Sequence, residues 1–213
     1  MKSDTTRTLI LKSAIDLFVE KGYHGTSTED IRKKADNLSR GGLYYHFPKK
    51  EDILRALPEY LSKSDEGLNE LLTSNSFQNT LEKIREIIIY KCNRIKVDSN
   101  EILYKRLMQD YTFKEVNAHY LEEYTIPLYT QLIMDGNSDG SLSVDYPEYF
   151  SPILVSVLND SLDPNEKNMT TSQISKRVSF IRDFLTTNGC PVFNEEVSSA
   201  FSKLMTLYLE WLV

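Results

Sequence analysis

The sequence predicts an all-α fold in two parts, a three-helix amino-terminal head joined to a larger helical domain. Apolar residues recur at helical spacing through nearly the whole chain, and no segment alternates like a strand for long. Helix start and stop signals divide that pattern into elements. A chain of 213 residues can bury a core, whereas a head of about 50 residues is marginal alone. We therefore expect a head over 1–56 that packs against a body over 57–213.

The head begins with a helix that ends at Gly22, where the apolar pattern stops. A second helix starts after Ser27, which can cap it, and Asp30 can complete a capping box from three residues further on. The buried face of the first helix is expected to hold Ile10, Ala14, Leu17 and Phe18, and that of the second Ile31 and Ala35.

A tight turn and a third helix follow. Asp36 and Asn37 tolerate the left-handed backbone that commonly ends a helix, so the second helix is expected to stop there. Ser39 can then cap a third helix that runs to Phe47, where Pro48 closes it. Two short helices around a turn are typical of a DNA-binding helix-turn-helix.

The third helix contains two adjacent glycines, Gly41 and Gly42, although each glycine costs a helix about 1 kcal/mol relative to alanine. Such a pair suggests that something approaches the backbone closely, and a phosphate-lined groove would qualify. The alternative is that the pair is merely a weak helix start. Leu43 and Phe47 are better explained as anchors of the helix in a small core.

This order of residues resembles the amino-terminal domain of the TetR family of transcriptional regulators. The resemblance covers about the first quarter of the chain and is specific, since many positions agree in order and spacing. One departure is a turn that is one residue longer, because Asp36, Asn37 and Leu38 stand where the family usually has two residues. This turn bears on how Arg40 is aimed. The agreeing positions are Leu17-Phe18, Gly22-Tyr23, Thr26-Ser27, Ile31, Ala35, Ser39, Gly41 to Phe47, and Lys50.

The resemblance implies a set of DNA contacts. Hydroxyl groups, lysines and helix amino-termini suit phosphate oxygens, whereas arginine is well shaped to recognise guanine in the major groove. The resemblance places Thr28 on a phosphate, Ser39, Arg40, Gly41 and Gly42 against base edges, and Tyr44, Tyr45, His46 and Lys50 on the DNA backbone.

Charge is divided unevenly along the chain. Residues 1–56 contain 11 Lys or Arg and 8 Asp or Glu, a net charge of +3, and the remainder carries a net charge of −9. A basic head on an acidic body suits a protein that meets DNA with one end. The overall pI of about 5.2 conceals this asymmetry.

The sequence indicates an intracellular protein without a metal or other cofactor. Its two cysteines, Cys92 and Cys190, are too few for a disulfide framework and are expected to be reduced and buried. No CxxC or HExxH pattern suggests a metal site. No apolar run approaches the ~20 residues that span a bilayer, and the first ten residues lack the apolar core of a signal peptide. We expect a cytoplasmic location and no membrane partner.

The body is expected to consist of successive helices. They are predicted over 49–61 with a kink or break at Pro58, then from Ser76, over 100–111, over 114–134, and from Pro147 or Ser151 to before Asp163. Residues 135–139, which include Gly136 and are followed by Gly140, are predicted as a loop. The bend at Pro58 could pass a signal between head and body or could merely let the helix wrap the core.

Two final helices, over 172–188 and from Asn194 onward, carry apolar stripes. One alternative is that both stripes face the core of their own domain. Further apolar residues, however, widen the stripes toward a second face of each helix. Members of the TetR family dimerise through carboxy-terminal helices, so a homodimer is expected. The stripes hold Ile174, Val178, Ile181 and Leu185, then Val197, Phe201, Leu204, Tyr208 and Trp211; the further residues are Phe180, Phe184, Ala200, Met205, Leu207 and Leu212.

The segment 104–150 is rich in aromatic residues, which form the walls of many small-molecule pockets in helical domains. Core packing explains each aromatic taken singly, and the resemblance favours an effector pocket for the group. Asp110, Glu122 and Glu123 are consistent with a cationic or amphipathic ligand. The expected pocket residues are Met108, Tyr111, Tyr120 and Tyr124.

The sequence therefore indicates a ligand-responsive transcriptional regulator, most simply a repressor that a small-molecule effector releases from a near-palindromic operator in double-stranded DNA. The alternative is a TetR-like co-regulator that acts through protein contacts without specific DNA recognition, which only the lengthened turn favours. An enzyme is not expected, because His24, His46 and His119 have no recognisable catalytic partners.

Overall fold

The computed structural model describes residues 2–94, 107–160 and 169–211, and side chains within 5–94, 107–159 and 169–207. Every regular element in these ranges is helical, which confirms the all-α prediction. The elements are α1 Lys2–Lys21, α2 Thr28–Lys34, α3 Arg40–His46, α4 Lys50–Lys63, α5 Glu66–Thr73, α6 Thr80–Arg94, α8 Tyr111–Tyr120, the π-helical turn η1 Leu121–Thr125, α9 Ile126–Asp139, α10 Pro147–Asp160, α11 Thr171–Thr187 and α12 Glu195–Trp211.

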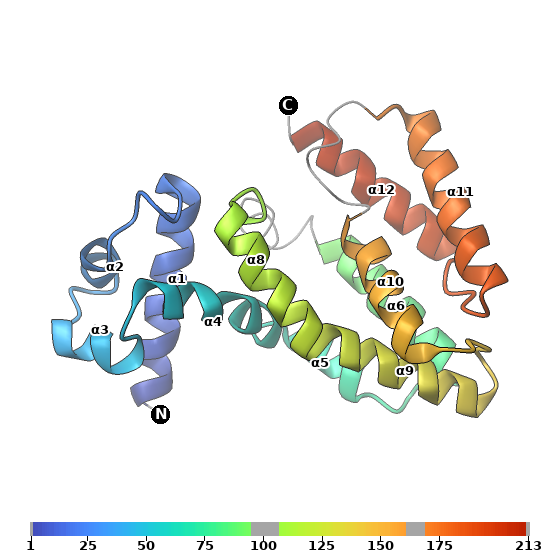
Figure 1. Ribbon diagram of the computed structural model, residues 1–213, viewed down its shortest axis with the longest axis horizontal. Coiled ribbons are helices and arrows are strands. Elements are labelled where there is room, and N and C mark those ends of the chain that lie inside the picture. The colour runs from blue at the N-terminus through green and yellow to red at the C-terminus, as the bar shows by residue number, and fades with distance from the viewer. Residues whose placement is uncertain (1, 95–106, 161–168, 212–213) are drawn as a thin grey trace. The chain divides into compact units, whose positions relative to one another are not determined.

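The chain divides into two compact units, each with an apolar core of its own. Unit 1 is Met1–Asp65 with Ser99–Tyr120, and unit 2 is Glu66–Asp98 with Leu121–Val213. Within unit 1, α2 and α3 lie on the same side of α1, and α4 crosses α1 (Figure 1).

Unit 1 is larger than the head expected over 1–56. Helix α4 continues to Lys63, and Leu57 on it is fully buried in the same core as Ile10 of α1. Helix α8 also belongs to this unit, because Phe113 is fully buried in that core and α8 packs along α4. Contacts from the aromatic middle segment of the chain thus complete the head, which local sequence patterns do not reveal.

Helix α4 passes through Pro58 without ending there, contrary to one of the outcomes expected from the sequence. The chain leaves helical geometry later, around Ser64 and Asp65, before α5 begins. Pro58 lacks an amide hydrogen, but it lies with Leu54 and Leu57 on the buried face of α4. Packing of that face offsets the missing backbone hydrogen bond.

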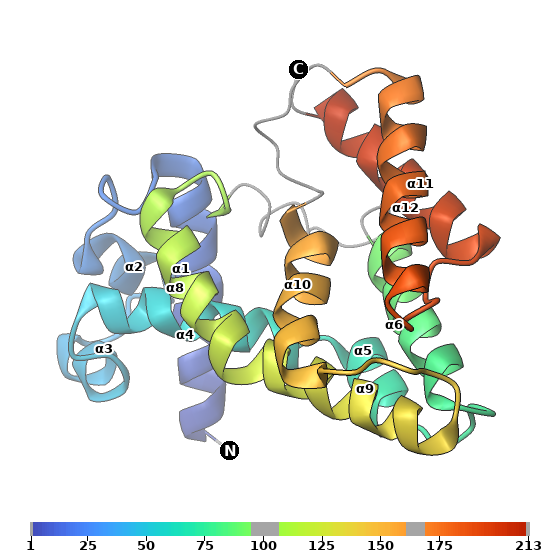
Figure 2. The ribbon, with the colours of Figure 1, turned by 45° about the vertical axis from the view of Figure 1, so that its right-hand side comes forward.

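Unit 2 is organised around α6, which contacts α5, α9 and α12. Helix α10 packs on α9, and α11 runs beside α12 (Figure 2). The apolar periodicity of these helices explains the arrangement, since the predicted stripe residues of α11 are all buried. Fully buried side chains of this core include Ile84, Ile133, Leu154, Leu185, Val192 and Val197.

The prediction of a loop over 135–139 was wrong. Helix α9 continues to Asp139 and ends at Gly140, which has a φ of +78°. Gly136 lies inside the helix because Leu142 packs directly on it, and a Cβ there would come within 2.6 Å of Leu142 Cδ1. This glycine allows close packing and does not break the helix.

Other helix boundaries also differ from those expected. Helix α6 begins at Thr80 and not at Ser76. The single helix expected over 114–134 is instead interrupted by η1 just ahead of Pro127, whose missing amide hydrogen favours a local change in hydrogen bonding. Most of the helix expected over 100–111 lies outside the described residues, as do Leu212 and the side chains of Tyr208 and Trp211.

The cysteines are free and buried, as expected. Burial raises the pKa of the Cys190 thiol to about 12, so this thiol is not a ready nucleophile. Within the described ranges no helix has the length and apolar character needed to cross a membrane. The same ranges contain no cluster of three His, Cys, Asp or Glu side chains that could hold a metal ion.

Asp139 fastens the end of α9 to the beginning of α6. Its Oδ2 accepts hydrogen bonds from the amide and the hydroxyl of Thr80, at 2.7 and 2.6 Å, and its Oδ1 accepts one from the amide of Ser141 at 2.9 Å. Hydrogen bonds from Ser141 and Thr80 hold the pKa of this carboxyl far below its usual value of 3.8. The ionised carboxylate therefore stabilises unit 2.

We expect Asp139→Asn to lower the unfolding midpoint at neutral pH. Because the folded pKa is depressed, the stabilisation by Asp139 is complete above the unfolded pKa and declines as pH falls below about 4. The difference in free energy of unfolding between the wild type and Asp139→Asn, measured with urea, should thus narrow as the pH falls from about 4 to about 2. A gap that stays constant across that range would contradict this role.

Candidate nucleic-acid interface

Both helices of the helix-turn-helix begin at a serine, as the sequence predicted. Ser27 Oγ accepts a hydrogen bond from the Asp30 amide at 3.1 Å, and Asp30 Oδ2 accepts one from the Ser27 amide at 2.9 Å. Ser39 Oγ accepts one from the Gly42 amide at 3.0 Å. Hydrogen bonds from Ser27 lower the pKa of Asp30, so its capping carboxylate is ionised at neutral pH. These caps fix where α2 and α3 begin.

The longer turn between α2 and α3 is held in a defined conformation. Asp36 and Asn37 both have positive φ, +53° and +52°, as the sequence led us to expect for Asp-Asn. Arg32 donates a hydrogen bond to the Leu38 carbonyl at 2.7 Å and two to the Glu29 carboxylate, at 2.8 and 2.9 Å. The guanidinium therefore ties the turn to α2, which gives α3 a fixed direction.

Helix α3 divides its side chains between core and solvent. Leu43 and Phe47 are buried in the core of unit 1, which confirms their expected anchoring role. Tyr44 and Tyr45 are exposed to 48% and 79%. The phenols are thus available to a partner, and hydroxyl groups of this kind suit phosphate oxygens.

The two glycines of α3 differ in their surroundings. A Cβ built on Gly41 would meet nothing within 4 Å, whereas one on Gly42 would lie 3.1 Å from both Leu38 Cδ1 and Ser39 Oγ. Gly42 is therefore explained by packing against the turn. Gly41 leaves the backbone bare on the solvent side, where a DNA groove could approach it.

Arg40 lies at the first residue of α3 with its side chain 80% exposed. Its Nε is 3.8 Å from Glu29 Oε2, a long contact that leaves most of the guanidinium free. The hydrogen bond from Arg32, with its charge and that of Arg40, lowers the pKa of Glu29. Among the other expected contact residues, Thr28 and His46 are half-buried, and Ser39 is exposed.

Lys50 is held by contacts within unit 1. Its Nζ donates to the carbonyls of Tyr23 and Thr26, at 2.8 and 2.9 Å, and lies 4.2 Å from the centre of the Tyr23 ring. Partial burial lowers the pKa of its ammonium group. The lysine thus joins the start of α4 to the turn between α1 and α2. Lys49, beside it, is exposed.

We expect Lys50→Met to destabilise the protein by about 2 kcal/mol, because hydrogen bonds from a charged group contribute roughly 1.5–3 kcal/mol and two carbonyls lose their donor. Lys49→Met is the matched control and should change stability by less than about 0.5 kcal/mol, as is usual for a surface position. Urea unfolding measures both. Equal effects for the two variants would show that Lys50 does not join these elements.

The four expected effector residues do not gather in one unit. Met108 packs against the core of unit 1, Tyr111 on the same unit is 74% exposed, and Tyr120 is half-buried. Tyr124 belongs to unit 2 and is 50% exposed. The effector pocket expected from these four residues stays a prediction.

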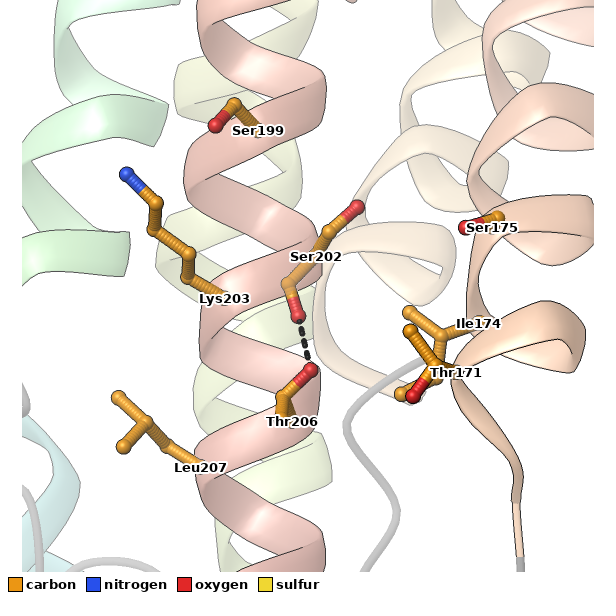
Figure 3. A pocket seen from close by; sticks show the side chains of 8 residues that line it. All are labelled: Thr171, Ile174, Ser175, Ser199, Ser202, Lys203, Thr206 and Leu207. Atoms are coloured by element: carbon orange, nitrogen blue, oxygen red, sulfur yellow. Dashed lines mark hydrogen bonds between the residues drawn. The ribbon is translucent and has the colours of Figure 1, made fainter.

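A hollow of about 340 Å³ lies between α11 and α12 in unit 2 (Figure 3). Two of its hydroxyl groups bond to their own helix, with Ser202 Oγ donating to the Ser198 carbonyl and Thr206 Oγ1 to the Ser202 carbonyl. Its volume lies at the lower end of those of small-molecule pockets. The lining residues are Thr171, Ile174 and Ser175 from α11 and Ser199, Ser202, Lys203, Thr206 and Leu207 from α12.

Sequence reasoning missed two residues that shape the interface. Arg32 had a usable signal, because it stands three residues after Glu29 and can pair with it. Thr26 was among the positions that carry the resemblance, but no role was assigned to it; its hydroxyl donates to the carbonyls of Leu17 and Gly22 on the preceding helix and turn, at 3.2 and 2.9 Å. This buried bond positions the start of α2 against α1.

Residues 10–57 match the family described as "Bacterial regulatory proteins, tetR family". IcaR of Staphylococcus epidermidis, described as a biofilm operon icaADBC HTH-type negative transcriptional regulator, is 50% identical over 46 residues, 22% of this chain and 24% of IcaR. YuxN of Bacillus subtilis, an uncharacterized HTH-type transcriptional regulator, is 40% identical over 52 residues, 24% of this chain and 18% of YuxN. The chain thus matches about a quarter or less of the length of these relatives.

Solved structures resemble the chain over most of its length. Salmonella enterica GusR has a TM-score of 0.59 at 19% identity and is matched over 97% of this chain and 96% of its own. The reduced form of Escherichia coli NemR has a TM-score of 0.61 at 17% identity, over 84% of this chain and 96% of its own. At such identities the likeness shows the fold, a helix-turn-helix head joined to a larger helical domain.

Proposed function

The chain belongs to the tetR family of bacterial regulatory proteins through its amino-terminal domain, and from this premise we propose that it is a transcriptional regulator that binds DNA sequence-specifically through α3. The observation that carries the proposal is the bare backbone at Gly41, flanked by the exposed side chains of Arg40, Tyr44 and Tyr45. A groove can approach a helix closely at a glycine, while arginine contacts base edges and phenols contact phosphates.

We assign the DNA contacts to these side chains and their neighbours as follows. Arg40 and Gly41 face base edges at the start of α3, and Ser39 and Gly42 complete that turn. Tyr44, Tyr45 and His46 contact the DNA backbone, and so does Thr28 at the start of α2. The exposed Lys49 adds a phosphate contact beside the one that the resemblance assigns to Lys50. The net charge of +3 on residues 1–56 attracts this part of the chain to DNA. The net charge of −9 on the remainder repels that part from DNA.

Regulation is by repression, with a small-molecule effector that releases the protein from its operator. IcaR, whose helix-turn-helix region is half identical to this one, is described as a negative regulator. The hollow between α11 and α12 supports a small effector, and Lys203 among its lining residues favours an acidic group on that effector. Such a ligand can release DNA only by binding more tightly to the state that does not fit the operator.

The active species is a homodimer that binds a near-palindromic operator in the cytoplasm, where bacterial DNA lies. Two copies of α3 must then contact major grooves about one helical turn, ~34–36 Å, apart. The arrangement follows from symmetry, because a dimer with a two-fold axis matches a palindromic DNA sequence, which has the same symmetry.

The proposal is tested by titrating the purified protein into the DNA that flanks its own gene, at two salt concentrations and with competitor DNA. We expect specific binding that weakens steeply with salt, because phosphate contacts release counterions. Lys49→Ala should weaken binding to all sequences alike. Binding no tighter than to competitor, there and to fragments across the genome, would favour the co-regulator that acts through protein contacts.

A further inference from the structure

A chain of charged side chains connects α2 to the first residue of α3. Glu29 lies in the first turn of α2, and Arg32 donates to its carboxylate twice, from Nη2 to Oε1 at 2.8 Å and from Nε to Oε2 at 2.9 Å. Arg40 Nε lies 3.8 Å from the same Oε2. The carboxylate therefore stands between two guanidinium groups, and its firm contacts are those with Arg32.

Arg32 holds this carboxylate in a fixed direction. Its Nη1 donates to the Leu38 carbonyl at 2.7 Å, and only 19% of its side chain is exposed. Two parallel hydrogen bonds from one guanidinium fix the orientation of a carboxylate, which a single contact does not. Leu38 belongs to the turn that leads into α3. One arginine thus sets both the course of that turn and the direction of the Glu29 carboxylate, so the carboxylate has a defined position relative to α3.

Arg40 pairs with no other carboxylate in the part of the chain that the structure describes, and its side chain is 80% exposed. An exposed ion pair contributes little to the stability of a protein, so the contact with Glu29 needs another explanation. A free arginine side chain loses rotamer freedom when it binds, and a contact that orders it beforehand reduces that loss. Glu29 is placed to order Arg40 before DNA is bound.

The contact also decides which donors of Arg40 remain for DNA. A guanidinium carries one N–H on Nε and two on each Nη. Because Nε is directed at Glu29, the two Nη groups are left, and they can donate side by side to O6 and N7 of guanine. A hydrogen bond from Arg32 lowers the pKa of Glu29, so its carboxylate is ionised at neutral pH. Phosphate is disfavoured, because a phosphate that approached Arg40 here would also approach this like charge.

We propose that Glu29, held by Arg32, is a positioning residue that directs Arg40 to guanine in the major groove and away from the DNA backbone. Arg32 is the second positioning residue, because it fixes the Glu29 carboxylate and the turn before α3 together. The inference rests on the proposed function, in which α3 recognises DNA, and it specifies the base that Arg40 recognises and the residues that set this preference.

The test is an anisotropy titration with the DNA site that the wild type selects, and with the other base pairs at the position where Arg40→Ala relaxes the preference. Glu29→Gln should lower the preference for guanine there about threefold or more, a part of the roughly fivefold or larger discrimination that a bidentate arginine–guanine pair provides. Its binding to non-specific DNA should stay the same or strengthen, because a negative charge is lost. Arg32→Lys keeps its charge but should also lower the preference, since lysine cannot form the parallel bonds.

Two controls separate positioning from other effects. Adding Glu29→Gln to Arg40→Ala should cause no further loss of preference at that position, because the side chain that Glu29 orders is then absent. Glu51→Gln removes the same charge from the exposed Glu51–Arg55 pair on α4, and it should leave the preference for guanine unchanged.

The inference is overturned if Glu29→Gln keeps the full preference for guanine, or if it lowers the preference equally with and without Arg40. An equal loss at every position of the site also overturns it, because such a loss means that α3 as a whole has moved. If the wild type selects a site and only Arg40→Ala relaxes it, the proposed function stands and this inference alone is removed. A wild type without any base preference contradicts both.

Discussion

Replacing Gly189 by alanine is expected to lower the free energy of unfolding by about 3 kcal/mol or more, through strain and overpacking together. Gly189 lies after α11 with a φ of +79°, and a Cβ there would come within 2.0 Å of the Ser143 carbonyl oxygen. The Ser143 amide donates to the Gly189 carbonyl at 2.9 Å, so the segments cannot separate without losing that bond. The added methyl group would thus break the contact between the α9–α10 and α11–α12 connections.

Gly140→Ala is the matched control in the same unit. Gly140 has nearly the same φ, +78°, but a Cβ there would meet nothing within 4 Å. Only the backbone strain remains, which costs roughly 1–2 kcal/mol. Urea unfolding of the two variants separates the cost of backbone strain from the cost of the clash with Ser143. Equal losses of stability would mean that Ser143 does not confine Gly189.

Gly41→Leu is expected to weaken operator binding about 100-fold or more, equivalent to roughly 2.7 kcal/mol, while leaving the protein folded. The leucine side chain would occupy the open space beside the α3 backbone, where we propose that the DNA groove approaches. Leucine is also a better helix former than glycine, so the free energy of unfolding should stay the same or rise by up to about 1 kcal/mol.

Gly42→Leu provides the contrast. A side chain there would press on Leu38 and on the hydroxyl of Ser39, so this variant should lose stability as well as affinity. Anisotropy titration with operator DNA, together with urea unfolding, distinguishes the two patterns. If Gly41→Leu binds the operator as the wild type does, the proposed approach of DNA to this side of α3 is wrong.

The elements that the sequence predicted correctly depend on short-range signals. The capping box of Ser27 and Asp30, the cap at Ser39 and the left-handed pair Asp36 and Asn37 all act within a few residues. Local chemistry decides such features, so they can be recognised without knowledge of the fold.

The features that were missed depend on residues distant in the sequence or on packing. Gly136 seemed to mark a loop, but Leu142 packs on it inside a helix. Local sequence did not show that the ammonium group of Lys50 donates to carbonyls 24 and 27 residues earlier in the chain. Aromatic content alone likewise does not reveal that Tyr111 and Tyr124 belong to different compact units.

The most direct test of the account is selection of binding sites from random double-stranded DNA with the wild type and with Arg40→Ala. We predict that the wild type enriches a near-palindrome whose half-sites are centred about 10–10.5 base pairs, or a multiple of that spacing, apart. Arg40→Ala should enrich the same spacing with reduced preference at one position in each half-site. No enriched sequence, or an identical preference for both proteins, would contradict the claim that α3 recognises DNA through Arg40.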